Sequence, residues 1–241
     1  MPGSGERRDR SRSGPIDASF VEDGPELPLS LSKLPPGRHR LPRHFVEQNQ
    51  RNRILLAGLN SFGTRRYTEV SVKDLVVEAH LSRATYYKYF PDRETCLAAV
   101  YEEVVSWIRD SLRDGPAESG PWPSRVRSAT ERIVAILAED RRLARICALE
   151  APLGPEKVRV RHERELGDLA ALLRAGRRES PWGSRLPDSL ETLLLAGAVS
   201  LVGRALVLEG GPSEELGTVI AEILLVPYVG GADASRLVGR D

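Results

Sequence analysis

Cysteine, net charge and long apolar runs are all scarce in this sequence of 241 residues, and each shortage excludes a class of protein. The two cysteines, Cys96 and Cys147, exclude a fold held by many disulfides and favour a reducing compartment. A formal net charge of +1 gives, over the whole chain, no indication of a nucleic-acid partner. The start of the chain lacks the apolar core of a signal peptide, and the longest apolar run, residues 193–203, is too short to span a bilayer. We therefore expect a cytoplasmic protein without a membrane segment.

Motifs of catalysis and metal binding are also missing. The sequence contains no glycine-rich phosphate loop, no Gly-x-Ser-x-Gly elbow, no His-Glu-x-x-His and no Cys-x-x-Cys. Its four histidines do not have the spacing of metal ligands. We therefore expect a protein that is not an enzyme and that needs neither a metal nor a cofactor.

What is present is an uneven distribution of charge. Residues 1–95 carry 16 basic and 12 acidic side chains, whereas residues 96–241 carry 19 and 22. The front of the chain is thus at +4 and the rear at −3. This difference suggests two regions with different partners, although ordinary solvated surface charge would also produce it.

Residues 1–41 have the composition of a disordered or extended basic tail. They hold six prolines, and four arginines lie between positions 7 and 12. No apolar periodicity runs through the segment. Arg38 and Arg40 lie in a stretch bounded by prolines, which disfavour a regular helix. Such a segment could follow a minor groove of DNA or serve only as a solvated linker.

Between residues 42 and 95 the residue pattern predicts three helices. The first has an apolar stripe that ends at Phe62, and Gly63 is suited to end the helix. A capping box that begins at Ser71 predicts a second helix over residues 72–79. Ser82 is a further N-cap candidate, for a third helix over residues 83–90. Two short helices joined by a turn of three or four residues form a helix-turn-helix, whose second helix enters the major groove of DNA.

The same region carries a longer pattern. It contains the run Leu81-Ser-Arg-Ala-Thr-Tyr-Tyr-Lys-Tyr-Phe-Pro-Asp-Arg-Glu94, preceded by Ile54-Leu55, Phe62, Tyr67 and the run Ser71-Val-Lys-Asp-Leu75. This pattern resembles the DNA-binding head of the TetR family of bacterial transcriptional regulators, over about residues 43–100. The resemblance implies an all-α fold: an N-terminal three-helix helix-turn-helix head at residues 42–95, followed by a C-terminal helical body at residues 96–241 that binds a ligand and dimerises.

The resemblance also implies which residues meet DNA. They match family positions that grip phosphate, that lie on the reading helix, or that clamp the DNA backbone: Ser71, Lys73, Arg83, Ala84, Thr85, Tyr87, Lys88, Tyr89 and Arg93. Arg83 is the candidate for base readout, because arginine can bond both O6 and N7 of guanine. A phosphate contact is the alternative for Arg83.

The chain departs from the family pattern where the family usually has glycine, at Arg66, His80 and Ala84. His80 matters most, because it lies in the turn between the two short helices. Glycine suits a left-handed backbone there, and histidine tolerates that region better than most residues with a Cβ. We expect the turn to survive at some strain.

The rest of the chain reads as a series of helices separated by glycine and proline, from a long helix at about residues 93–112 to a last one that stops at Pro227. The candidates for a ligand pocket on the middle helices are Trp107, Cys147 and Leu173, although residues of this kind are more often plain core. No polar cluster identifies the effector, although a basic segment at residues 141–145 could bind an acidic one.

The last two predicted helices are more apolar than a surface pair requires. We expect a symmetric dimer interface on them, formed by Leu194, Gly197, Leu201, Leu216, Ile220 and Ile223. An ordinary monomer core is the alternative. The dimer is favoured because a head of this kind has to meet two half-sites on DNA.

The sequence thus predicts a dimeric, ligand-responsive DNA-binding transcriptional regulator, most simply a repressor that a small-molecule effector releases from a double-stranded operator. The alternative is an all-helical small-molecule-binding or scaffold protein whose head no longer reads DNA. Only His80 and the near-neutral charge support that alternative.

Overall fold

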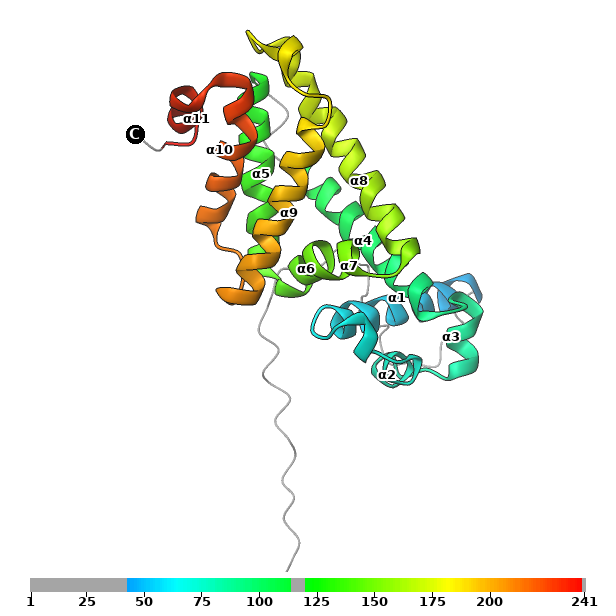
Figure 1. Cartoon of the computed structure of the whole chain (residues 1–241). Helices are drawn as coiled ribbons and strands as arrows, with labels where there is room; N and C mark the ends of the chain where they lie inside the picture. The colour runs from blue at the N-terminus through cyan, green and yellow to red at the C-terminus, as the bar shows by residue number, and fades with distance from the viewer. Residues whose placement is uncertain (1–42, 114–119, 240–241) are drawn as a thin grey trace, which may run out of the picture.

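The computed structural model describes residues 43–113 and 120–239, and over these residues the chain is built from helices without a strand. A small head lies at one end of a larger helical body, and α4 (Arg93–Arg113) runs from the head into the body (Figure 1). The predicted tail, with Arg38 and Arg40, lies outside the described residues. The all-α fold expected from the sequence is confirmed.

Three helices form the head: α1 (Arg43–Phe62), α2 (Val72–Glu78) and α3 (Arg83–Tyr89), with the short 3-10 turn η1 (Tyr67–Glu69) before α2. Both predicted N-caps are present, because the Ser71 hydroxyl accepts the Asp74 backbone N–H and the Ser82 hydroxyl accepts that of Thr85. These caps satisfy helix-end donors that would otherwise lack partners, and so fix where each short helix begins. Beneath them Tyr86 is fully buried.

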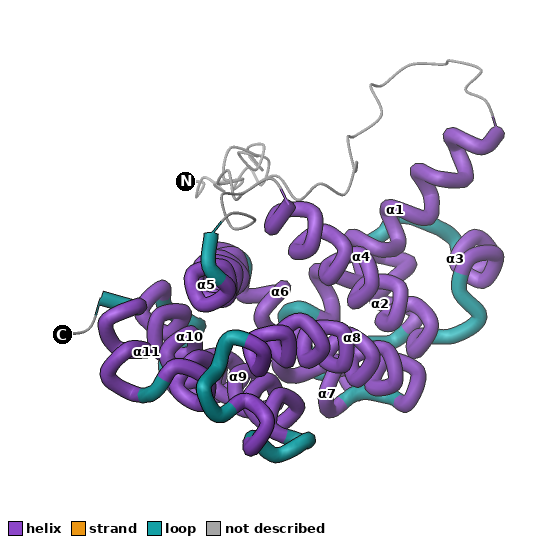
Figure 2. Tube along the Cα trace, turned by 90° about the horizontal axis from the view of Figure 1, so that it is seen from above, coloured by secondary structure: helices purple, strands orange, loops and turns teal. Residues whose placement is uncertain are grey.

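The body is a layered set of helices. Its elements are α5 (Trp122–Glu139), α6 (Arg141–Arg145), the π-helical turn η3 (Ile146–Glu150), α7 (Ala151–Leu153), α8 (Glu156–Arg174), the 3-10 turns η4 (Ala175–Arg178) and η5 (Gly183–Arg185), α9 (Leu190–Leu208), α10 (Glu214–Val229) and α11 (Gly231–Leu237). Helix α8 lies between α4 and α9, and α10 packs along α5 (Figure 2). The short α6 contacts both α1 and α9, so it joins the head to the body.

The end of the chain differs from the prediction. The sequence pattern stops the last helix at Pro227, but α10 includes this proline and ends two residues later at Val229. A proline removes one helical hydrogen bond, which is a small loss near the end of a helix. The next residue, Tyr228, is only 1% exposed, and its burial outweighs that loss. Gly230, with a φ of 87°, then turns the chain into α11, which the sequence analysis did not predict.

Helix α9 is longer than the apolar run seen in the sequence. By length and composition alone it could cross a membrane, so residues 193–203 underestimate the length of the apolar segment. In the structure α9 packs against α6, α8 and α10 and carries the fully buried Glu191. Much of its apolar surface stays uncovered, since Leu193 is 70% and Val207 68% exposed. An exposed apolar surface of this kind is typical of an interaction site.

Candidate nucleic-acid interface and its link to the body

Helix α3 has a buried face and an exposed polar face. Tyr86 is fully buried and donates its hydroxyl to the Asp92 backbone oxygen at 3.1 Å. The residues on the other face are exposed: Arg83, Ala84, Tyr87 and Lys88. Thr85, between the two faces, is half-buried. Anchoring by Tyr86 leaves Arg83, Tyr87 and Lys88 without a hydrogen-bond partner among the described residues, whereas the Thr85 hydroxyl is hydrogen-bonded to that of Ser82 at 2.9 Å. The three free donors suit the helix for a base edge or a phosphate.

The start of α2 offers a second set of exposed polar groups. Lys73 is exposed and makes no hydrogen bond or ion pair with another described residue. Ser71 donates both its backbone N–H, at 2.7 Å, and its hydroxyl, at 2.6 Å, to the Asp74 carboxylate. These two bonds lower the pKa of Asp74, so the carboxylate stays ionised. Ser71 can therefore donate to a phosphate only if its N–H or hydroxyl is shared with the Asp74 carboxylate or released from it.

Two of the predicted DNA contacts are held inside the head in the free protein. Tyr89 is half-buried and donates its hydroxyl to Gln50 at 3.0 Å. Arg93 donates to the backbone oxygens of Tyr67 and Val70, and its guanidinium lies 4.6 Å from the centre of the Tyr67 ring. Arg93 thus ties the segment before α2 to the start of α4. Both residues support the position of the reading helix, and their contact with DNA stays a prediction.

The turn between α2 and α3 is intact despite the missing glycine. His80 has a φ of 52°, and it is the only non-glycine residue with positive φ in the described part of the chain. Arg53 of α1 donates to the backbone oxygens of Ala79, at 2.6 Å, and His80, at 2.8 Å. These bonds hold the end of α2 in place. The expectation that the turn survives is confirmed, and the main support for a head that no longer reads DNA is lost.

We expect His80→Gly to stabilise the protein. A left-handed residue with a Cβ costs about 1–2 kcal/mol, and the greater freedom of glycine in the unfolded chain cancels part of the gain. The free energy of unfolding in urea should rise by about 0.5–1 kcal/mol. His80→Ala is the control and should lower it, because alanine tolerates this backbone less well than histidine. A glycine variant no more stable than the alanine variant would show that the turn carries no strain.

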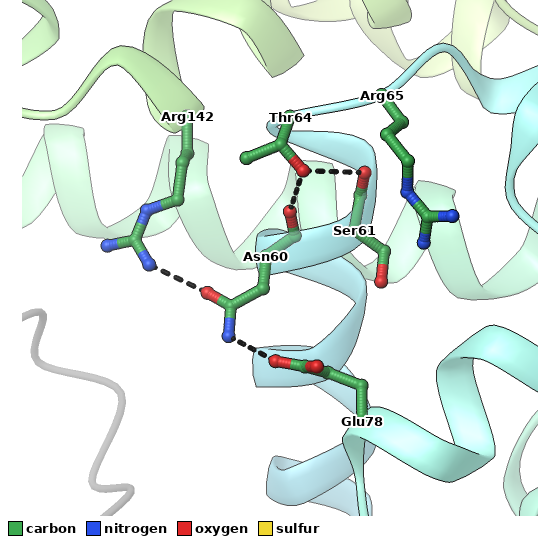
Figure 3. Close-up of a pocket in the computed structure, with 6 residues that line it drawn as sticks. All are labelled: Asn60, Ser61, Thr64, Arg65, Glu78 and Arg142. Atoms are coloured by element: carbon green, nitrogen blue, oxygen red, sulfur yellow. Dashed lines mark hydrogen bonds between the residues drawn. The ribbon is translucent and has the colours of Figure 1, made fainter. Parts of the chain in front are cut away.

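The head is fastened to the body by a chain of polar side chains (Figure 3). Arg142 of α6 is held by both carboxylate oxygens of Asp140 and donates to Asn60 of α1 at 2.7 Å. Asn60 in turn donates to Glu78 of α2 at 2.9 Å. The hydrogen bonds with Asp140 raise the pKa of Arg142. Helix α6 is therefore connected through Asn60 to both α1 and α2.

A second connection uses a buried carboxylate. Glu150, at the end of η3, is 7% exposed and accepts the Tyr67 backbone N–H at 2.8 Å. Arg145 donates to its other oxygen, also at 2.8 Å. A further link joins Lys157 of α8 to Asp92, between α3 and α4, because Lys157 donates to the Asp92 side chain at 3.1 Å. Glu150, Asn60 and Asp140 were not singled out from the sequence, because their partners lie on other helices.

The predicted pocket residues differ in burial, and their grouping around a ligand stays a prediction. Leu173 is buried, whereas Trp107 and Cys147 are half-buried. Burial raises the pKa of both the Cys96 and the Cys147 thiol to about 12, so both stay protonated. The cavities found, of about 350 and 390 Å³, lie instead where the head meets the body, and none of the three residues lines them.

Most of the predicted interface residues reach the surface of the chain. Gly197 and Ile223 are exposed, and Leu194, Leu201 and Leu216 are half-buried. Ile220 is a correction: it is 3% exposed and belongs to the chain's own core, because helical periodicity does not tell an inner face from an interface. Further exposed apolar residues on these helices lie outside the predicted interface set: Leu193, Val207, Leu208 and Val226.

Comparison with known proteins agrees with the fold and the head. A family model for bacterial regulatory proteins of the tetR family matches residues 54–100. The HTH-type transcriptional regulator EthR of Mycolicibacterium smegmatis is 35% identical over 68 residues, which are 28% of this chain and 31% of that protein. The match thus spans about a third of this relative's length.

Solved structures extend the likeness to the body. The fatty acid degradation regulator FadR from Bacillus halodurans has a TM-score of 0.62 at 18% identity, covering 74% of this chain and 94% of that one. TylP, a tetR regulator from Streptomyces fradiae, has a TM-score of 0.60 at 17% identity, covering 81% and 92%. FadR from Bacillus subtilis, solved in complex with stearoyl-CoA, has a TM-score of 0.57 at 17% identity, covering 74% and 97%. At these identities the likeness establishes the fold.

Proposed function

By its head the chain belongs to the TetR family of bacterial regulatory proteins, and from this premise we propose that it is a cytoplasmic, dimeric transcriptional regulator that binds a DNA operator and is released by a small molecule. The observation that carries the proposal is the exposed polar face of α3, held outward by the buried Tyr86. We assign residues 42–95 to DNA binding and residues 96–241 to ligand binding and dimerisation. The protein works without catalysis, metal or cofactor.

The head binds DNA through two helix starts. Arg83 and Thr85, in the first turn of α3, meet base edges in the major groove, while Tyr87 and Lys88 follow the flanking phosphates. Lys73 in the first turn of α2 contacts the DNA backbone. The exposure of Arg83, Tyr87, Lys88 and Lys73 supports their contact with DNA, and Thr85 is half-buried beside them.

The exposed apolar face on α9 and α10 supports a symmetric dimer. Leu193, Ile223 and Val226 are 70%, 43% and 39% exposed on helices whose other faces are packed. Soluble monomers rarely leave such a surface open. A two-fold axis through this face pairs it with itself and presents two heads to two half-sites.

Release follows from the polar links between head and body. A ligand acts only by binding one arrangement of the body more tightly than another. The Arg142–Asn60–Glu78 chain transmits a change in α6 to the head. That FadR from Bacillus subtilis was solved with stearoyl-CoA supports a ligand-bound state for this fold. We propose repression relieved by the ligand as the sign of regulation.

We expect Arg83→Ala to weaken specific binding by about 1–3 kcal/mol, because a bidentate contact to guanine is lost. Binding is measured by gel shift on duplexes that span the promoters of its own gene and of the neighbouring genes, beside a duplex of random sequence. Lys73→Ala is the control and should weaken both duplexes alike and reduce the salt dependence. Equal losses for Arg83→Ala on both duplexes would make Arg83 a phosphate contact. No salt-sensitive binding to any promoter would reject the regulator.

A further inference from the structure

A cavity of about 390 Å³ opens where the end of α1 meets α6, η3 and α9. It is lined by Gly63, Thr64, Arg141, Arg142, Arg145, Leu149, Leu206 and Val207. Its neighbour, of about 350 Å³ and shown in Figure 3, shares Thr64 and Arg142 with it. The cavity thus lies beside the links that fasten the head to the body.

The three arginines of this cavity differ in what they already bind. Arg142 is fully engaged by Asp140 and Asn60. Arg145 donates from one nitrogen to Glu150, but its Nε is buried and has no hydrogen-bond partner. Arg141 is exposed and makes no hydrogen bond or ion pair with another described residue. Arg141 can therefore donate directly, whereas the Arg145 Nε is enclosed and reaches an acceptor only if its guanidinium turns. A buried donor without an acceptor is costly enough to require an explanation.

The remaining wall of the cavity is apolar. Leu149 and Leu206 are half-buried, and Val207 is 68% exposed. Positive charge on one side and aliphatic carbon on the other fit a molecule with one acidic group on an apolar body. Among the residues that line this cavity there is no acidic side chain that would compete for the free donors.

We propose that this cavity binds a small organic anion. Its carboxylate or phosphate group accepts hydrogen bonds from Arg141 and from the Arg145 guanidinium, whose Nε comes within reach once that side chain turns, and its apolar part lies against Leu149, Leu206 and Val207. Charge-assisted bonds to guanidinium groups are the strong kind, and two of them orient the acidic group.

The position gives the bound anion an effect on the head. Arg145 bonds Glu150, and Glu150 accepts the Tyr67 backbone N–H before α2. An anion on Arg145 shares this guanidinium with Glu150 and so weakens the hold of Arg145 on the Glu150 carboxylate beside the head. This regulatory consequence rests on the proposed function, whereas the binding of the anion does not.

The test is titration calorimetry of the full-length protein with hexanoate, with the uncharged hexanamide and with inorganic phosphate. Hexanoate should bind at least about tenfold more tightly than hexanamide, and Arg141→Gln should weaken hexanoate by about tenfold. Arg164→Gln, on the exposed side of α8 and away from this cavity, is the charge-matched control and should bind hexanoate as the native protein does.

A second variant tests Arg145 without leaving a buried charge that could unfold the protein. Arg145→Gln alone would leave Glu150 buried without its cation, so it is combined with Glu150→Gln, which can still accept the Tyr67 N–H. The double variant should also lose hexanoate binding by about tenfold, with an unchanged circular dichroism spectrum. Hexanoate binding that both arginine variants retain, or phosphate binding without hexanoate binding, would overturn the proposal. A protein that binds hexanoate but no promoter duplex would overturn the regulator and leave this site standing, and the reverse result would do the opposite.

Discussion

Glu191→Ala is expected to lower the free energy of unfolding by about 3–5 kcal/mol, because it removes one partner of a buried ion pair. Glu191 is 0% exposed and accepts from Arg177 at 2.6 and 2.9 Å and from the Tyr228 hydroxyl at 2.8 Å. Without the carboxylate, the buried Tyr228 hydroxyl and the Arg177 Nε lose their acceptor, and Arg177 keeps only its bonds to backbone oxygens. Urea denaturation measures the loss. Glu163→Ala, at an exposed site on α8, is the control and should change stability by less than about 0.5 kcal/mol.

The same carboxylate predicts a dependence on pH. Burial by itself raises the pKa of Glu191, but the hydrogen bonds from Arg177 and Tyr228 lower it to about 2, below its ordinary value of 4.5. The folded state therefore gains stability above about pH 4.5 and loses it as the pH falls toward 2. Glu191→Gln should lose less stability than the native protein between pH 5 and 3, as urea midpoints at each pH will show. Parallel curves for the two proteins would contradict the assigned pKa.

This cluster fixes the loop between α8 and α9. Arg177 also donates to the backbone oxygen of Leu186 at 2.8 Å and to that of Pro187 at 2.5 Å. The Trp122 ring packs edge-on against Tyr228, with centroids 4.9 Å apart. One buried acid thereby joins α5, α9, α10 and the turn after α8. Its loss should loosen the end of the body that lies away from the head (Figure 1).

The head could be predicted from the sequence because its signals are local. Ser71 caps α2 through Asp74, and Ser82 caps α3 through Thr85, each pair only three residues apart. The links between head and body have no such signal. Glu150 and Tyr67 are 83 positions apart, and nothing beside either residue in the chain indicates the other.

The body was predicted less completely for a related reason. Apolar periodicity shows that a helix face is covered, but it does not show by what. Ile220 and Ile223 lie on the same helix three residues apart, and the first is 3% and the second 43% exposed. Only the packing of α10 on α5 separates the core residue from the candidate interface residue.

Gly197→Asp is expected to weaken the dimer without unfolding the chain. Gly197 is exposed in the middle of α9, and an added Cβ would meet nothing within 4 Å in its own chain. In a symmetric interface the new carboxylate appears twice and is taken out of water without a partner. Unpaired or opposed charges at an interface cost several kcal/mol, so the dissociation constant should rise by at least about 100-fold. Sedimentation equilibrium measures it.

Gly167→Asp is the matched control for this change. Gly167 is also exposed within a long helix, α8, and a Cβ there would likewise meet nothing within 4 Å. Both variants gain helix propensity and one negative charge, so they differ only in the face that receives the charge. If α9 forms the interface, the control should sediment as the native dimer does. Equal masses for the two variants would place the interface elsewhere.

The loss of the dimer should reach DNA binding although Gly197 is far from the head in the chain. Two linked heads bind two half-sites as one event, because the second head is held at high effective concentration once the first is bound. Separated heads each have to bind alone, so affinity for a duplex with two half-sites should fall by at least about tenfold, whereas affinity for a single half-site should not change. Retained affinity in a variant shown to be monomeric would mean that each head binds DNA independently, and that the apolar face of α9 and α10 serves another partner.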